Sequence, residues 1–254
     1  MFSLSGRRGL KWRLLPAIEL LFRAVGRRWV DFYAWMLNRQ EKNNSIDKII
    51  KANKSAADKH KGLYDLSTTD THLRFLLAQG LEPQHVFVDF GCGYGRTAIP
   101  LLHYLEPGLY TGIEISSERL RMARDYVDRE GLQGKRPRFV ESKDLDISYL
   151  PDASVDAVWA LTVASHMPLV DLTRLMHAMW RILRPGGWFV FDFIASEAGE
   201  RRSSVKDFEY PAVAVRQAAE AEGFRVSVVD FQAGGEQPPE WGYPNCVVFR
   251  IEKA

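Results

Sequence analysis

The sequence predicts an α/β protein, with an open and mostly parallel sheet behind a helical N-terminal extension. After residue 80, short apolar runs alternate with segments of helical periodicity, a pattern typical of strands joined by crossover helices. The last two apolar runs have no helical segment between them, so we expect one antiparallel strand near the end. Residues 1–62 are mainly helical in pattern and basic. We therefore predict an extension at 1–62 and an α/β domain at 63–254.

Seven strands make up the predicted sheet. The first, Val86 to Phe90, is a short apolar run that ends in glycines, which favours a buried parallel strand. The others are expected at 110–115, 138–141, 155–161, 188–194, 225–231 and 247–251. Helices are expected at 69–78, 97–105, 117–129, 169–183 and 213–222. Several of them end at glycine or proline, as helices commonly do.

One long helix is expected near the N-terminus. Its apolar residues recur at steps of three and four from a start near Pro16: Leu14, Ile18, Leu21, Phe22, Val25, Trp29, Phe32 and Met36. Such a helix can pack on its own domain, lie on an anionic membrane as a peripheral contact or form a homodimer contact, because its tryptophans suit an interface and a core alike. The polar, Lys-rich residues 40–62 fit a linker or a solvated helix.

Charge is unevenly distributed along the chain. The net charge is +2, but residues 1–44 hold nine Lys and Arg against three Asp and Glu, so the remainder is mildly acidic. Nucleic acid is not the expected partner, because RNA or DNA would meet a broader basic face. No run approaches the ~18 to 20 apolar residues that span a bilayer, and we expect no secretory signal.

Cys92 and Cys246 have neither a disulfide framework nor metal-ligand spacing. We therefore expect reduced thiols and no metal. A cytoplasmic location follows as the default, with the inner membrane surface as the alternative.

A glycine-rich turn follows the first predicted strand. Gly91, Gly93 and Gly95 stand at alternate positions, where the lack of side chains lets a ligand approach the backbone. Amides at the start of the following helix would favour a negative group such as a carboxylate. The dinucleotide fingerprint is not met, because Arg96 stands where it needs its third glycine. The next strand ends in Glu114, which can accept hydrogen bonds from both hydroxyls of a ribose.

Four blocks between about Asp65 and Ile251 resemble the class I S-adenosylmethionine-dependent methyltransferases that carry a D-x-G-C-G-x-G turn. They are Val86 to Gly95, Tyr110 to Ser116, Asp144-Leu145 followed by Leu150 to Asp156, and Arg181 to Gly187. Each block is modest alone, but their order and spacing together are specific. The resemblance implies a Rossmann-like fold, S-adenosyl-L-methionine as cofactor and S-adenosyl-L-homocysteine as product.

The resemblance also implies cofactor-binding roles by position. The residues are Asp89, Gly91, Cys92 and Gly93 for the methionine part, Glu114 for the ribose, Ile115, Asp144 and Leu145 for adenine, and Leu161 beside the methyl group. Asp89 is expected to act through water or the neighbouring backbone. For Asp144 the alternative is an ordinary loop carboxylate, and Cys92 is expected to be a small apolar filler.

Two residues are candidate catalytic groups. Methyl transfer from a sulfonium is a direct displacement, so the protein must align the reactants and exclude water. A general base is needed only for an acceptor that is protonated at the working pH. His166, just past the fourth strand, is the candidate base, and the alternative is that it shapes the pocket. Tyr64, ahead of the first strand, is the second candidate, with packing as an equal alternative.

The predicted function is methyl transfer to a small-molecule, glycan or lipid acceptor. Residues 195–211 are short and charged and offer no large substrate domain. We therefore expect the N-terminal helices and the loop at 232–245 to shape the acceptor site. A nicotinamide-dependent oxidoreductase and a cofactor-binding module without turnover are the rival functions, and Arg96 counts against the first.

Overall fold

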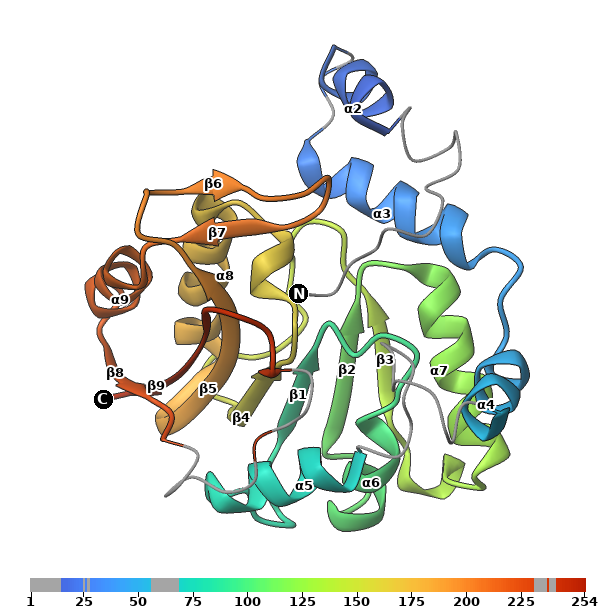
Figure 1. Ribbon diagram of the computed structural model, residues 1–254. Coiled ribbons are helices and arrows are strands. Elements are labelled where there is room, and N and C mark those ends of the chain that lie inside the picture. The colour runs from blue at the N-terminus through green and yellow to red at the C-terminus, as the bar shows by residue number, and fades with distance from the viewer. Residues whose placement is uncertain (1–14, 25, 27, 56–68, 231–236, 238–240) are drawn as a thin grey trace.

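A parallel sheet forms the centre of the computed structural model (Figure 1), which describes residues 15–24, 26, 28–55, 69–230, 237 and 241–254. Five parallel strands lie in the order β3-β2-β1-β4-β5. They are β1 (Phe87–Phe90), β2 (Tyr110–Glu114), β3 (Arg138–Glu141), β4 (Val155–Ala160) and β5 (Leu183–Ala195). The strand order reverses between β1 and β4, which is where ligands bind in such sheets.

The end of the sheet contains the reversed strand that the sequence predicts. β9 (Cys246–Lys253) runs antiparallel to β5, and β8 (Phe224–Val228) pairs with β9. The prediction of a mostly parallel sheet with an antiparallel strand near its end is confirmed. The prediction of seven strands is incomplete, because a short hairpin of β6 (Arg201–Arg202) and β7 (Phe208–Tyr210) adds two more.

The position of this hairpin is set by the length of β5. The last residues of β5, Ile194 and Ala195, extend past the end of β4 and pair with Glu209 and Tyr210 of β7. β9 occupies the other edge of β5 as far as Ile194, so β7 continues the sheet beyond the carboxyl end of β4. The charged segment 195–211 therefore places a hairpin above the ligand-binding edge (Figure 1).

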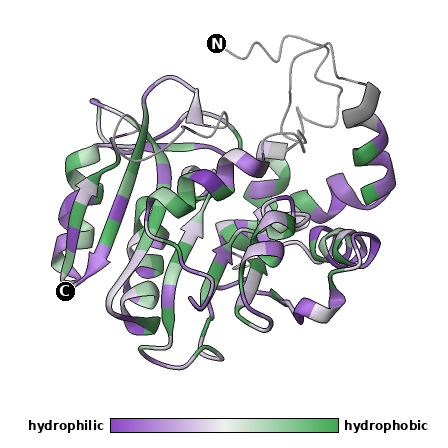
Figure 2. Ribbon diagram, turned by 90° about the horizontal axis from the view of Figure 1, so that it is seen from below, coloured by the Kyte–Doolittle hydropathy of each residue, from purple (hydrophilic) through white to green (hydrophobic). Residues whose placement is uncertain are grey.

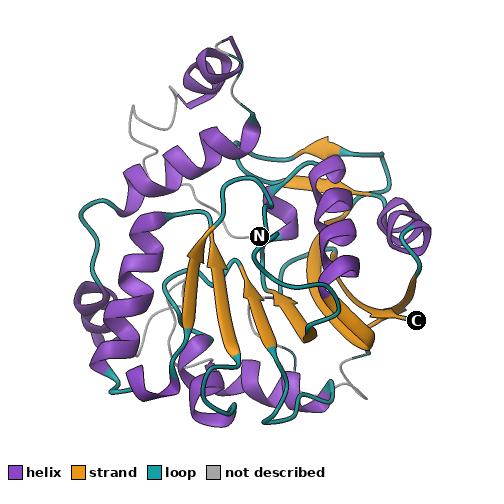
Figure 3. Cartoon of the chain, turned by 180° about the vertical axis from the view of Figure 1, so that it is seen from behind, coloured by secondary structure: helices purple, strands orange, loops and turns teal. Residues whose placement is uncertain are grey.

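Helices cover both faces of the sheet (Figure 3). They are α5 (Thr69–Ala78), α6 (Ala98–Tyr104), α7 (Ser117–Arg129), α8 (Leu169–Ile182) and α9 (Ala212–Ala221). Neighbouring strand residues point to opposite faces, so Phe87 packs with Phe75 of α5 while Val88 joins the core of Met176 from α8. Figure 2 shows apolar residues along the strands inside the molecule.

The N-terminal stripe forms two helices, so the prediction of one continuous helix is wrong. α2 (Leu15–Ala24) and α3 (Trp29–Glu41) are separated at Gly26, whose φ of +74° is a left-handed conformation that ends a helix. α3 contributes Phe32 and Met36 to the main core. Leu14 and Val25 of the predicted stripe lie outside the described residues.

The Lys-rich segment after α3 contains α4 (Ile46–Ser55), which packs on α7. Ile46 and Ile49 are buried in a cluster with Met122 and Tyr126, so residues 46–55 form a packed helix and not a linker. The predicted boundary at 62/63 lies outside the described residues and stays a prediction. Within the described ranges, no helix combines the length and apolarity needed to cross a bilayer.

Candidate active site

A cavity of about 330 Å³ opens at the carboxyl ends of β1, β2 and β4. Gly91, Glu114 and Leu161, which end or follow these strands, form part of its wall. α3 crosses this edge of the sheet (Figure 1) and contributes Trp29 and Tyr33. The remaining lining is largely apolar, with cationic side chains from Arg28, Arg119, Arg174 and Lys206.

The glycine turn after β1 forms part of the cavity wall. A Cβ atom at Gly91 would lie 2.3 Å from Cγ2 of Val163, and the φ of Gly91 is +82°, so the position requires glycine. The amides of Gly91 and Cys92 donate to the carbonyl oxygen of Ile113 at 2.7 and 3.0 Å. These two amides therefore hold the turn against β2. The Cys92 side chain is buried beside Gly112, and burial raises the pKa of its thiol.

Glu114, the last residue of β2, is fixed by three backbone amides. Its Oε1 accepts hydrogen bonds from Ile115 (2.8 Å) and Ser116 (3.0 Å), and its Oε2 accepts one from Gly93 (3.0 Å). A carboxylate can accept about four hydrogen bonds. Glu114 is thus oriented at the cavity wall with capacity left for the hydroxyls of a ligand.

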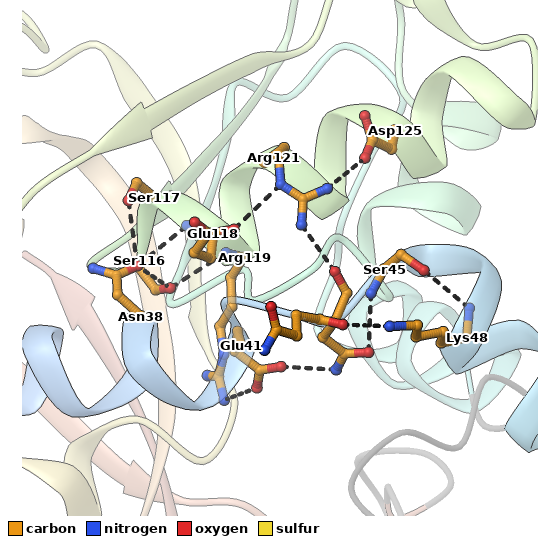
Figure 4. Close-up of polar contacts among 12 residues, drawn as sticks. Asn38, Glu41, Ser45, Lys48, Ser116, Ser117, Glu118, Arg119, Arg121 and Asp125 are labelled. Atoms are coloured by element: carbon orange, nitrogen blue, oxygen red, sulfur yellow. Dashed lines mark hydrogen bonds and ion pairs between the residues drawn. The ribbon is translucent and has the colours of Figure 1, made fainter.

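The first turn of α7 is tied to α3 by Asn38 (Figure 4). The Oδ1 atom of Asn38 accepts hydrogen bonds from the hydroxyls of Ser116 (2.8 Å) and Ser117 (3.2 Å) and from the amide of Glu118 (3.2 Å). The first amides of a helix lack partners within the helix. Asn38 therefore caps α7 from a different helix, next to the turn that carries Glu114.

Asp89, predicted to help hold the methionine ammonium, lies just beneath the cavity. It is 2% exposed, and its Oδ2 accepts a 2.8 Å hydrogen bond from the hydroxyl of Tyr110. Burial raises the pKa of Asp89 to about 7, against the opposing effects of Tyr110 and Arg96. Asp89 does not line the cavity. The expected role of Asp89 through water or the neighbouring backbone stays a prediction.

The predicted adenine side of the cavity is formed by Ile115, Asp144 and Leu145. The carboxylate of Asp144 is exposed and pairs with Arg28, which precedes α3, and with Arg174 of α8 at 3.5 Å. The structure thus places Asp144 at the rim, shared between two guanidinium groups. Its role toward an adenine amino group stays a prediction.

His166 also lines the cavity and pairs with Asp207, the residue before β7. The His166 Nδ1 and Asp207 Oδ1 atoms are 2.9 Å apart. Burial lowers the pKa of His166 below its usual 6.5, although Asp207 opposes this effect. Burial would raise the pKa of Asp207, but the adjacent His166 and Lys206 outweigh it and lower that pKa to about 2. At neutral pH the pair is therefore a neutral imidazole beside a carboxylate.

The turn that carries His166 is held from two sides. Nε1 of Trp29 in α3 donates a 3.1 Å hydrogen bond to the carbonyl oxygen of His166. The hydroxyl of Tyr210 in β7 donates to the carbonyl oxygen of Ala164 at 2.5 Å. The ring of Tyr33 lies 5.4 Å from the imidazole. The N-terminal helix and the β6–β7 hairpin together therefore fix the candidate base.

Sequence patterns do not single out Trp29, Tyr33, Lys206 or Asp207 as site residues. The apolar–polar–apolar alternation of residues 208–210 after a polar turn is the signal that could have revealed β7, and with it Asp207. Trp29 and Tyr33 look like ordinary core residues in the sequence because they do belong to the core.

The role of Tyr64, the second candidate catalytic residue, stays a prediction. Tyr64 lies outside the described residues.

Comparison with known proteins points to one family. Residues 88–191 match the family model described as a methyltransferase domain. A 27-O-demethylrifamycin SV methyltransferase of Amycolatopsis mediterranei is 31% identical over 185 residues, which are 68% of this chain and 63% of that protein. The comparisons support a class I S-adenosylmethionine-dependent methyltransferase.

Other methyltransferases match over different extents. A sterol 24-C-methyltransferase of Neurospora crassa is 30% identical over 128 residues, 50% of this chain and 32% of that protein. A magnesium protoporphyrin IX methyltransferase of Synechocystis PCC 6803 with bound S-adenosylhomocysteine has a TM-score of 0.61 at 14% identity, covering 89% of this chain and 100% of that one. The chain spans about a third to a half of the length of the sterol methyltransferases that it matches.

S-adenosylmethionine is the cofactor of this methyltransferase family, and the residues present fit it. The Gly91 position has no room for a side chain, Glu114 is oriented to accept from hydroxyls, and Ile115 and Leu161 supply apolar walls. When bound, the cofactor supplies a methyl group activated by a positively charged sulfur.

Proposed function

We propose that this chain methylates a hydroxyl oxygen of an apolar small molecule or lipid, with His166 as the general base. The observation that carries the proposal is the 2.9 Å contact between His166, which lines the cavity, and Asp207. A hydroxyl is protonated at neutral pH, so its transfer reaction needs a proton acceptor.

The electrostatics of the pair suit this task. With its proton on Nδ1, which lies 2.9 Å from the Asp207 carboxylate, the neutral imidazole has Nε2 as the unprotonated nitrogen that can accept the hydroxyl proton. The bound cofactor would supply the methyl group to this oxygen and leave as S-adenosylhomocysteine, and His166 would keep the proton. Asp207 stabilises the resulting imidazolium by charge and orients the ring. Trp29 and Tyr210 hold the turn that carries His166, so the imidazole keeps its orientation toward the acceptor.

The cavity lining supports an apolar acceptor. Trp29, Val30, Tyr33 and Met167 surround the end that holds His166, and such walls bind an apolar molecule and exclude water. The relatives named above act, by their names, on an oxygen of a rifamycin and on carbon 24 of sterols, so both act on small molecules.

Cofactor binding is the first test. A saturating ligand that binds only the folded state raises stability by about 2.7 kcal/mol at a hundred times its Kd. We expect S-adenosylhomocysteine to raise the melting temperature of the full chain, and NAD to leave it unchanged. Stabilisation by NAD alone would favour the oxidoreductase alternative and contradict the proposal.

The base is tested by the variants His166→Gln and Asp207→Asn. Transfer of tritiated methyl groups from the cofactor to a total lipid extract should fall by about 10²-fold or more, with S-adenosylhomocysteine affinity retained. His177→Gln is the matched control, because His177 makes a similar 2.8 Å contact with Glu222 but is 73% exposed and outside the cavity. Equal transfer by parent and His166→Gln would remove His166 from the mechanism.

The pH dependence supplies a second readout of the same base. His166 must be neutral to accept a proton, and burial lowers its pKa below 6.5. The rate of the parent should therefore fall only on the acid side of pH 6.5 and stay level through neutral pH. A rate that still climbs steeply above pH 7 would contradict the assignment.

A further inference from the structure

α2 presents an apolar surface that the rest of the described chain does not cover. Leu20 and Leu21 are 68% and 66% exposed. The opposite side of α2 is anchored, because Phe22 packs on Phe32 and Trp35 of α3 with ring centroids 5.8 and 5.7 Å apart. In Figure 1, α2 projects from the molecule beyond α3.

The only acid of α2 is turned away from this surface. Glu19 is buried and pairs with Arg202 of β6 at 2.6 Å and with Arg23 at 3.1 Å. The exposed side of the helix therefore combines two adjacent leucines with the largely exposed Arg23. Amphipathic helices of this composition bind the interface of anionic bilayers.

Positive charge is concentrated at the same end of the chain. Residues 1–28 carry seven Lys and Arg and one acid, whereas the whole chain has a net charge of only +2. A basic segment is attracted to anionic lipid headgroups. The same charge would repel a second copy of the chain, and two leucines bury far less than the ~1,200 Å² of a stable dimer interface.

We propose that α2 is a membrane-docking helix that inserts Leu20 and Leu21 into the interfacial layer of an anionic bilayer. The docked helix leads directly to the cavity, because Arg28 and Trp29 follow it and line the cavity wall. Arg202 connects α2 to the cavity wall, since it pairs with Glu19 of α2 and its guanidinium lies 4.3 Å from the centre of the Trp29 ring. A bilayer held at α2 would therefore lie near the acceptor end of the cavity.

The test is flotation of the full chain with vesicles. We expect the parent to float with equimolar phosphatidylcholine and phosphatidylglycerol at low salt, and to remain unbound with phosphatidylcholine alone. The double variant Leu20→Ser/Leu21→Ser should lose most of this binding. Val213→Ser on α9 is the matched control, because Val213 is 60% exposed on a different helix, and it should float like the parent.

Melting temperature and S-adenosylhomocysteine binding are measured on the same samples. Both should be unchanged in the double variant, so a failure of docking is distinguishable from a failure of the proposed function. Equal flotation of parent and double variant would overturn the docking role of α2. Absence of parent flotation would overturn it as well. If the parent is a dimer and the double variant is a monomer, the surface serves self-association and the proposal is wrong.

Discussion

At the scale of residues, the cavity wall depends on backbone conformations that few side chains tolerate. Gly91 has a φ of +82°, and Thr162, which also lines the cavity, has a φ of +55°. A β-branched residue in this region is strained. The strain at Thr162 is offset by its amide, which donates a 2.5 Å hydrogen bond to the buried carboxylate of Asp192. Strained positions of this kind cluster at functional sites.

The Gly91→Ala variant should lose cofactor binding. Its Cβ would both overlap Val163 and occupy a left-handed conformation, so we expect a loss of about 3 kcal/mol in the free energy of unfolding. Gly131→Ala is the control, because Gly131 has a φ of +68° with no atom within 4 Å of the added Cβ. It should lose about 1 kcal/mol and bind S-adenosylhomocysteine normally. Urea unfolding and calorimetry measure the two quantities, and equal affinities would contradict the steric argument.

At the scale of elements, α3 does more than cover the sheet. Through Asn38 it caps α7, and through Trp29 it supports the His166 turn. The two ends of the cavity are thus both attached to one helix of the N-terminal segment. Movement of α3 would disturb the ribose side and the acceptor side together.

Asn38→Ala should weaken both stability and cofactor binding. Loss of the cap should cost about 1 kcal/mol of unfolding free energy. We expect the Kd for S-adenosylhomocysteine to rise severalfold, because the adjacent Glu114 turn is then held less firmly. Ser45→Ala is the matched control, since the Ser45 hydroxyl caps α4 by accepting from the Lys48 amide (Figure 4). Ser45→Ala should lower the free energy of unfolding by a similar amount and leave the Kd for S-adenosylhomocysteine unchanged. A raised Kd in both variants would mean that any loss of stability weakens binding, and would contradict a specific role of Asn38.

At the scale of the whole molecule, buried carboxyl groups make stability depend on pH. Burial raises the pKa of Asp192 to about 6 and that of Asp89 to about 7, from an ordinary value of 3.8. Between the ordinary pKa of 3.8 and these raised values, the folded protein holds protons on Asp192 and Asp89 that the unfolded chain releases. Their contribution is therefore complete below about pH 4 and is lost as pH rises through 6 and 7.

Asp192→Asn should flatten this dependence. A shift of about two pKa units corresponds to up to about 3 kcal/mol in the free energy of unfolding. Between pH 5 and pH 8, the urea midpoint should therefore fall further for the parent than for the variant. Asp152→Asn, at an exposed position, should follow the parent. His166 acts in the opposite direction, since its lowered pKa removes stability below pH 6.5. Identical slopes for parent and Asp192→Asn would contradict the role of Asp192.

The sequence by itself determined the alternating strands and helices, the reversed last strand and the glycine turn beside Glu114. These features depend on local periodicity and on residues close to one another in the chain. Gly91, Glu114, Ile115, Leu161 and His166 do line one cavity, because the carboxyl ends of parallel strands share an edge.

Only the tertiary structure decided what surrounds that edge. β5 extends beyond the end of β4, so β7 can pair with its last residues. This pairing places Asp207, the residue before β7, next to His166. Asn38 reaches Glu118 across 80 residues, and Gly26 divides the predicted single helix so that α3 can cross the cavity while α2 projects. Such contacts arise from the packing of elements distant in the chain, which no local pattern of residues encodes.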